Sequence, residues 1–198
     1  MKIIKIIGLG VLTIFALIAI LLIASKLYHE IQLSKEAKKY PAPGSMVDVN
    51  GKKLHVYVEG EGDITLVFMA GHGTSNPTLD FKPLWGKMVD QYRIAVIEKS
   101  GYGWSESSKS PRDIDTLLSE TRKALELHGE RGPYVLVPHS MSGLEAIYWA
   151  QKYPDEVKAI IGLDPLIPET FTVMPEPQKQ QLYPMYFISR IEIGRASC

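Results

Sequence analysis

The sequence feature that most restricts the fold is a segment in which an apolar run passes into a helical pattern with no loop between them. Residues 134–137 read YVLV, which is typical of a strand buried on both faces, and a helix is predicted from Met141 to about Tyr153. Ser140 therefore lies on the sharp turn between strand and helix. Such a turn holds a hydroxyl above the sheet edge, beside the positive end of the helix dipole. The alternative interpretation is a serine that only caps the helix.

The elements around this turn predict an α/β fold. A hairpin is expected first, because Asn50-Gly51 is a strong signal for a two-residue turn between strands. Apolar runs without alternation then indicate buried strands. Asp113 or Asp115 can cap a long amphipathic helix, and Gly129 can end it. The predicted elements are strands at 46–49, 54–58, 64–70, 92–98, 134–137 and 157–163 and helices at about 81–89, 113–128 and 141–153. This order gives a mostly parallel sheet with an antiparallel N-terminal hairpin.

The strand-to-helix turn resembles the nucleophile elbow of the α/β-hydrolase superfamily, whose esterases and peptidases often read G-H-S-M-G-G there. Residues 138–143 read PHSMSG, which departs from that string at Pro138 and Ser142, where the family has glycine. The resemblance implies that Ser140 is the nucleophile and that the N–H of Met141 helps to bind the oxyanion. Serine is a mild change, whereas proline lacks an N–H and needs a suitable backbone. Ser142 fits the nucleophile role less well, because it would lie within the first helical turn.

Two further segments resemble the same superfamily at the ends of strands. The first is the loop Gly71-His72-Gly73, where the family supplies a second oxyanion N–H, and the resemblance assigns this donor to His72, with Gly73 next to it. A plain strand-to-helix turn is the alternative for this loop. The second segment, EKSGYGWS at 98–105, resembles the pattern D-R-x-G-x-G-x-S and is interpreted as a structural turn. Together the matches cover about residues 46–165.

The resemblance also shows what the sequence lacks. The superfamily orders its triad as serine, acid and histidine, and the serine needs the histidine as its base. No histidine follows Ser140: the five are His29, His55, His72, His128 and His139. Asp164 ends a strand and is a candidate acid, although members more often carry the acid later. We therefore expect the chain to be the N-terminal part of a hydrolase, inactive by itself, with 167–190 beginning a cap over the site.

An uncharged run of 20 residues, from Ile6 to Ser25, precedes the predicted domain. As a helix it spans about 30 Å, the thickness of a bilayer core. The run is long for a signal peptide and has no small-x-small cleavage site, which favours an uncleaved signal anchor over a cleaved leader. Lys2 and Lys5 favour a cytoplasmic N-terminus, whereas Lys26 and the lysines after it oppose this orientation. We expect a single-pass membrane protein with an extracytoplasmic catalytic domain.

Composition limits the remaining possibilities. The formal net charge is +0 and no basic stripe is interleaved with aromatic residues, so no nucleic-acid partner is expected. No Cys/His cluster has zinc spacing, Cys198 is the single cysteine, and we expect neither a metal nor a cofactor. The predicted parts are a transmembrane anchor at 1–25, a charged linker at 26–43, a hydrolase domain at 44–191 and a non-native tail at 192–198 that reads like a sequencing adapter.

The sequence thus predicts a membrane-anchored serine hydrolase that cleaves a small-molecule ester, thioester or peptide through an acyl-enzyme on Ser140. A serine at this position argues against haloalkane dehalogenases and epoxide hydrolases, whose nucleophile there is aspartate. Two other classes stay open. A non-catalytic binding protein of the same fold is favoured by Pro138 and the missing histidine. A membrane-tethered structural protein would leave the elbow and the glycine loop unexplained.

Overall fold

The computed structural model describes residues 2–170, in two units that are treated separately. The first unit contains helix α1, Lys2–Lys39. It continues through the charged residues that follow the apolar run, and its large apolar side chains from Ile4 to Leu27 are exposed. Within residues 2–170, α1 is the one helix long and apolar enough to cross a membrane. Its length and composition therefore agree with the predicted span.

The second unit begins with the predicted hairpin. Strands β1 (Ser45–Val49) and β2 (Lys52–Glu59) pair antiparallel. The residues between them, Asn50 and Gly51, have φ angles of 56° and 76°. Two consecutive positive φ angles define the type I′ turn, whose twist matches that of the flanking strands. The Asn-Gly signal is therefore confirmed.

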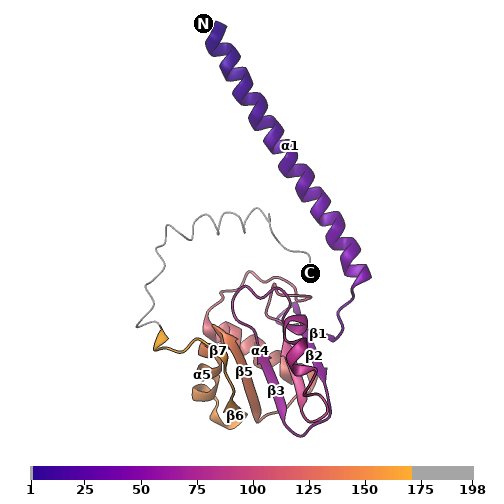
Figure 1. Cartoon of the computed structure of the whole chain (residues 1–198), viewed down its shortest axis with the longest axis vertical. Helices are drawn as coiled ribbons and strands as arrows, with labels where there is room; N and C mark the ends of the chain where they lie inside the picture. The colour runs from indigo at the N-terminus through magenta and orange to yellow at the C-terminus, as the bar shows by residue number, and fades with distance from the viewer. Residues whose placement is uncertain (1, 171–198) are drawn as a thin grey trace. The chain divides into compact units, whose positions relative to one another are not determined.

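A mostly parallel sheet follows the hairpin, as predicted (Figure 1). The strand order is β1-β2-β4-β3-β5-β6, in which β2 and β4 are antiparallel and the later pairs are parallel. A short strand β7 pairs with the end of β5. The bounds are β3 Thr65–Met69, β4 Arg93–Ile97, β5 Tyr134–Ser140, β6 Val157–Ile160 and β7 Leu163–Pro165. The strand predicted at 157–163 is thus divided into two.

Two long helices lie where the sequence predicts them. Helix α4 (Ile114–His128) is capped by the side chain of Asp113, which accepts from the N–H of Thr116. It ends at Gly129 with φ of 95°, a conformation that glycine adopts without strain. Helix α5 (Ser142–Lys152) follows β5 after one intervening residue, and a 3-10 turn η1 (Pro154–Glu156) leads on to β6.

The helix predicted at about 81–89 is different in the structure. Two short helices take its place, α2 (Pro77–Asp80) and α3 (Lys82–Trp85), and turns follow to residue 91. Each short helix has a proline in its first turn, where the missing N–H costs nothing. Pro83 thus begins a new helix, and Gly86 directly follows its end.

The core consists of two clusters on the two faces of the sheet. Alternate residues of β3 enter different clusters: Val67 and Met69 pack with α4 and α5, whereas Leu66 and Phe68 pack with Trp85 of α3. All of β3 is buried. A strand covered on both faces needs apolar residues throughout, which explains the continuous apolar run that predicted it.

Candidate active site

The turn after β5 has the strained backbone of a nucleophile elbow. Ser140 is the last residue of β5, its φ angle is 54°, and α5 begins at Ser142. Positive φ is unusual for a residue with a side chain and persists where the surrounding structure imposes it. The N–H of Leu166 donates to the Ser140 carbonyl at 2.8 Å, and a Cβ on Gly143 would overlap Leu166 and Pro165. The segment after β7 therefore packs closely against the turn and holds it.

The proline in β5 lies where its missing N–H does no damage. Within the described chain, β5 pairs with β6 up to Leu136 and with β7 from His139. Pro138 falls in the gap between these two partners. On the other side it stays in register with Met69 of β3. Because the ladder is already interrupted at this point, proline is tolerated in an otherwise central strand.

The glycine loop after β3 packs directly against the serine side chain. A Cβ built on Gly71 would lie 2.8 Å from the Cβ of Ser140 and 3.3 Å from its Oγ. Glycine is therefore required by space at this position. The arrangement brings the loop at 71–73 and the elbow together, although the two segments are far apart in the sequence.

Three backbone amides were predicted to bind an oxyanion, and they differ in their surroundings. The N–H of Gly73 donates to the Tyr102 hydroxyl at 3.1 Å. The N–H groups of His72 and Met141 have no protein acceptor among residues 2–170. Met141 also directly precedes α5, where the helix dipole favours negative charge. The pair of amides at 72 and 141 is thus the better arranged to receive an anion.

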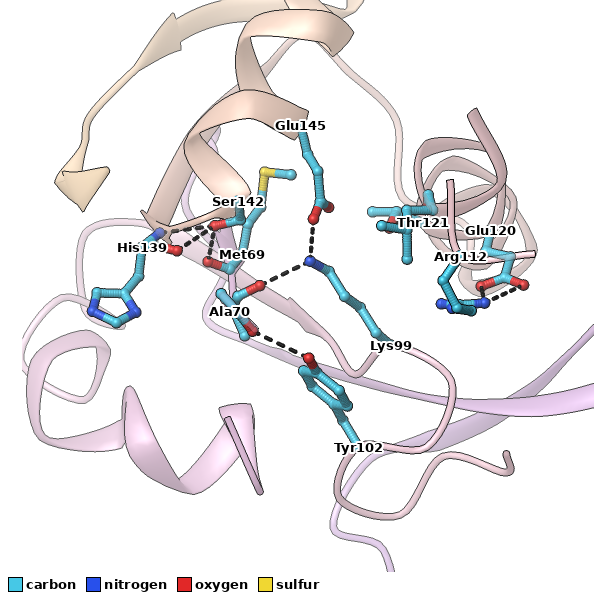
Figure 2. Close-up of polar contacts among 12 residues, drawn as sticks. Met69, Ala70, Lys99, Tyr102, Arg112, Glu120, Thr121, His139, Ser142 and Glu145 are labelled. Atoms are coloured by element: carbon cyan, nitrogen blue, oxygen red, sulfur yellow. Dashed lines mark hydrogen bonds and ion pairs between the residues drawn. The ribbon is translucent and has the colours of Figure 1, made fainter. Parts of the chain in front are cut away.

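Ser142 is engaged in the structure of the turn. It is fully buried, and its hydroxyl accepts from the N–H of His139 at 2.9 Å and lies 2.6 Å from the carbonyl of Met69 (Figure 2). The hydroxyl therefore bridges the ends of β5 and β3. Ser140, by contrast, is only partly buried. This difference favours Ser140 over Ser142 as the serine that meets a substrate.

The segment at 98–105 forms the predicted tight turn around a buried carboxylate. Glu98 accepts hydrogen bonds from the Thr78 hydroxyl and the N–H of Trp104, both at 2.8 Å. The Nδ1 atom of His55 lies 3.1 Å from the same carboxylate, and its Nε2 accepts from the N–H of Gly44. His55 is fully buried, although the alternation in β2 predicts a polar, outward residue there. A buried charge at the end of β4 needs partners, and His55 is one of them.

Sequence reasoning missed two side chains that reach the glycine loop. Lys99 donates to the carbonyl of Ala70 at 2.8 Å and pairs with Glu145 of α5. The hydroxyl of Tyr102 contacts both the N–H of Gly73 and, at 3.3 Å, the carbonyl of Gly71. One signal for Lys99 was present in the sequence: the family pattern has arginine at this position, so the positive charge is kept. The whole segment was interpreted from the sequence only as a structural turn.

The predicted acid and the histidines are less well placed for catalysis. Asp164 is exposed, has φ of 48°, and lies in β7, whose neighbours pair with His139 and Ser140. The His139 ring packs edge-on to Phe81 at 6.3 Å between centroids, directed away from the Ser142 hydroxyl (Figure 2). In the part of the chain that the structure describes, no histidine hydrogen-bonds to Ser140. Most of the predicted cap, and the predicted tail, lie outside these residues.

Acidic and histidine side chains do not gather into a metal site within residues 2–170. The backbone amides of His72 and Met141 near Ser140 are groups that bind anions and polarised carbonyls. Acyl transfer through the serine hydroxyl is the chemistry that this arrangement suits.

Known proteins resemble this chain over most of the domain. A family model described as alpha/beta hydrolase fold matches residues 60–186. The uncharacterized protein YbdG of Bacillus subtilis (strain 168) is 46% identical over 167 residues, which cover 84% of this chain and 51% of YbdG. The 2-(acetamidomethylene)succinate hydrolase of Mesorhizobium japonicum is 25% identical over 118 residues, covering 60% of this chain and 41% of that enzyme.

A solved structure agrees in fold. The enol-lactonase from Burkholderia xenovorans LB400 superposes with a TM-score of 0.53 at 23% identity, covering 59% of this chain and 45% of that protein. This chain spans about half the length of the curated relatives it matches, at 51% for each of the first two.

Proposed function

The chain belongs to the alpha/beta hydrolase fold family, and we propose that it carries the nucleophile half of a membrane-anchored serine hydrolase. The observation that carries this proposal is the elbow: Ser140 has φ of 54° between β5 and α5. Two amides that have no protein acceptor among residues 2–170, at His72 and Met141, flank the turn. A helix-capping serine would explain neither the strained backbone nor the close approach of Gly71. The relatives named as hydrolases support the same class.

The proposed reaction is acyl transfer in two steps. The Ser140 Oγ attacks the carbonyl carbon of the substrate, its proton passes to a histidine base, and the amides of His72 and Met141 bind the resulting oxyanion. The bond to the leaving group breaks as that group receives the proton, which leaves an acyl-enzyme. Water then attacks the acyl-enzyme with the same base, which releases the acid and restores the Ser140 hydroxyl. In the family the histidine follows the nucleophile along the chain, and no histidine follows Ser140 in this sequence.

The substrate class follows from the reaction. An ester, a thioester or a peptide bond each has a carbonyl that forms an oxyanion, and the site as described suits all three. We propose a small-molecule ester as the first substrate to test, because one solved structure of the same fold is an enol-lactonase. A p-nitrophenyl ester is the simplest probe.

Labelling by a fluorophosphonate probe tests the nucleophile. The protein expressed from its complete reading frame should be labelled at Ser140, and Ser140→Ala should remove the label. Ser119→Ala is the matched control, because Ser119 is an exposed serine on α4. A label that remains in Ser140→Ala, or that maps to Ser142, contradicts the assignment. A folded protein that takes no label supports instead a non-catalytic binding protein of this fold.

The candidate acid can be assigned in the same assay. Asparagine keeps the size of Asp164 and tolerates its positive φ, so Asp164→Asn changes little except the charge. A loss of turnover of about 10³-fold or more would identify Asp164 as the residue that orients the histidine. Turnover within a few-fold of the wild type would place the acid later in the chain, where the family more often has it.

The proposed anchor is α1, with the N-terminus in the cytoplasm and the domain exported. The protein should remain in the membrane pellet after a carbonate wash. A soluble form that begins near residue 26 would show that the segment is a cleaved signal peptide. Protease treatment of intact cells tests the orientation, because an exported domain is digested and a cytoplasmic one is protected.

A further inference from the structure

Three consecutive carbonyls lead from β3 into the glycine loop, and a different side chain holds each of them (Figure 2). Met69 O lies 2.6 Å from the Ser142 hydroxyl, Ala70 O accepts from Lys99 Nζ at 2.8 Å, and Gly71 O accepts from the Tyr102 hydroxyl at 3.3 Å. The three side chains come from α5 and from the turn after β4. The loop that carries the His72 amide is therefore held by two other segments of the site.

The Ser142 contact ties the loop to the elbow itself. The hydroxyl is fully buried and accepts from the N–H of His139, while its own hydrogen is directed to Met69 O, the shorter of its two contacts with carbonyls. Glycine, which the family has at this position, could not make this bridge. Serine in place of the family's glycine at position 142 therefore adds a hydrogen-bonded link between the elbow at Ser140 and the strand end that leads into the glycine loop.

The Lys99 contact ties the loop to the first turns of α5. The Lys99 ammonium pairs with Glu145 as well as donating to Ala70 O, and the two side chains are 11% and 9% exposed. A buried ion pair contributes little net stability, because desolvation offsets the attraction between the charges. Its geometric effect remains, since one ammonium group fixes both the loop and the helix that begins at the elbow.

The Tyr102 contact closes the loop on itself. One hydroxyl donates to Gly71 O and accepts from Gly73 N–H, so it holds the residues on either side of His72. With both neighbours fixed, the peptide plane that carries the His72 N–H has little freedom to rotate. This bond also accounts for the Gly73 amide, which is not free to bind an oxyanion.

We propose that Ser142, Lys99 and Tyr102 are positioning residues that hold residues 69–73 so that the His72 amide faces the carbonyl attacked by Ser140. The proposal rests on the proposed serine hydrolase function. None of the three side chains touches the substrate in this scheme. They act by keeping an oxyanion donor within the narrow limits that transition-state stabilisation requires, where a displacement of about 1 Å can cost 10²-fold in rate.

Tyr102→Phe is the sharpest test, because it removes one hydroxyl and leaves the ring. In the protein expressed from its complete reading frame, kcat for p-nitrophenyl acetate should fall about 10-fold with KM unchanged, since the oxyanion forms only in the transition state. Hydrogen exchange at the Gly73 amide should become about 10-fold faster, because its acceptor is lost. Tyr148→Phe is the matched control, because its hydroxyl contacts Asp115 of α4 and Lys152 of α5 and not the glycine loop.

Equal kcat and equal Gly73 exchange in Tyr102→Phe and Tyr148→Phe would overturn the proposal. A fall in both kcat and the melting temperature that Tyr148→Phe reproduces would also overturn it, because it would reflect stability alone.

Lys99 provides a second variant pair. Lys99→Met should lower kcat, and Lys99→Arg should restore most of it, because arginine can still donate to Ala70 O and pair with Glu145. A kcat that is low in Lys99→Met and close to the wild-type value in Lys99→Arg supports the positioning role of Lys99. Equal activity in Lys99→Met and the wild type would remove Lys99 from the set.

The two proposals fail separately. If the wild type takes no label at Ser140, the serine hydrolase function is wrong, yet exchange at Gly73 still reports whether Tyr102 holds the loop. If Ser140 is labelled normally while the Tyr102 and Lys99 variants keep wild-type kcat, the hydrolase function stands and the positioning role is wrong.

Discussion

The two ends of strand β5 are built in different ways. At its amino end, charged side chains form ion pairs with one another. Both carboxylate oxygens of Glu130 accept from the Arg93 guanidinium at 2.7 Å, and Glu156 pairs with Arg122. At its carboxyl end, Ser140 is held at positive φ and the amides of His72 and Met141 have no protein acceptor in the described chain. Charged side chains at one end of β5 are thus paired, whereas two backbone donors at the other end have no acceptor in the described chain.

This contrast separates stability from function. A groove of about 420 Å³ lies at the amino end and is lined by Arg122, Glu130 and Glu156 among others. Glu130 and Glu156 are nevertheless engaged in ion pairs with Arg93 and Arg122. Ligands of parallel α/β sheets bind beyond the carboxyl ends of the strands, where unpaired backbone groups are available. The groove is therefore a poorer guide to the active site than the amides of His72 and Met141, which have no protein acceptor in the described chain.

The largest expected effect comes from adding one methyl group at the carboxyl end. Gly71→Ala would place a Cβ 2.8 Å from the Cβ of Ser140 and 2.9 Å from the carbonyl of His139. We expect turnover of a p-nitrophenyl ester to fall by about 10²-fold, because the loop must move away from the serine. Ser119→Thr adds one methyl group to a side chain that lines the groove at the amino end, and it should leave turnover unchanged. Equal turnover in Gly71→Ala and Ser119→Thr would contradict the assignment of catalysis to the carboxyl end of β5.

The next effect is on stability and belongs to the amino end. Glu130 is 6% exposed, and Glu130→Gln would leave Arg93 without its bidentate partner. We expect the free energy of unfolding to fall by about 1–3 kcal/mol at pH 7, measured by urea denaturation with tryptophan fluorescence. Labelling of the folded protein at Ser140 should not change. Loss of labelling without loss of stability would mean that this end takes part in catalysis.

Lowering the pH should remove the stabilisation that ionised Glu130 gives to the folded protein. The hydrogen-bonded Arg93 guanidinium, followed by His128, holds the pKa of Glu130 below its ordinary value of 4.5. A carboxylate whose pKa is lowered on folding stabilises the protein above its ordinary pKa and loses that contribution as the pH falls through the lowered value. The difference in unfolding free energy between the wild type and Glu130→Gln should therefore shrink as the pH falls below 4.5. A difference that grows as the pH falls below 4.5 would contradict this assignment.

The sequence predicted the local structures that depend on neighbouring residues. The Asn50-Gly51 turn, the caps of α4 and the elbow at Ser140 all follow from short local patterns, and the structure has them. The positions of the glycine loop and the elbow followed from the fold, because parallel strands end at the same edge of the sheet.

Contacts between distant segments were not predicted. The Tyr102 hydroxyl meets Gly73 across 29 residues, and Lys99 meets Glu145 across 46. No periodicity or turn signal encodes such pairs, because they depend on how the loops pack after the sheet has formed. His55 shows the same limit: alternation in β2 predicts a side chain facing solvent, whereas a buried Glu98 draws it inward. The division of the helix at 81–89 could have been anticipated from Pro83.

The smallest expected effect is at an exposed ion pair of the amino end. Lys123 and Glu126 lie 3.0 Å apart on α4, and their side chains are 47% and 71% exposed. Water solvates both charges about as well as they solvate each other, so Lys123→Ala should change the unfolding free energy by less than about 0.5 kcal/mol. The same urea denaturation experiment measures it, with Glu130→Gln as the comparison on the same face. A loss as large as that of Glu130→Gln would mean that this end depends on all its charges together, and that the Arg93–Glu130 pair has no special part in stabilising it.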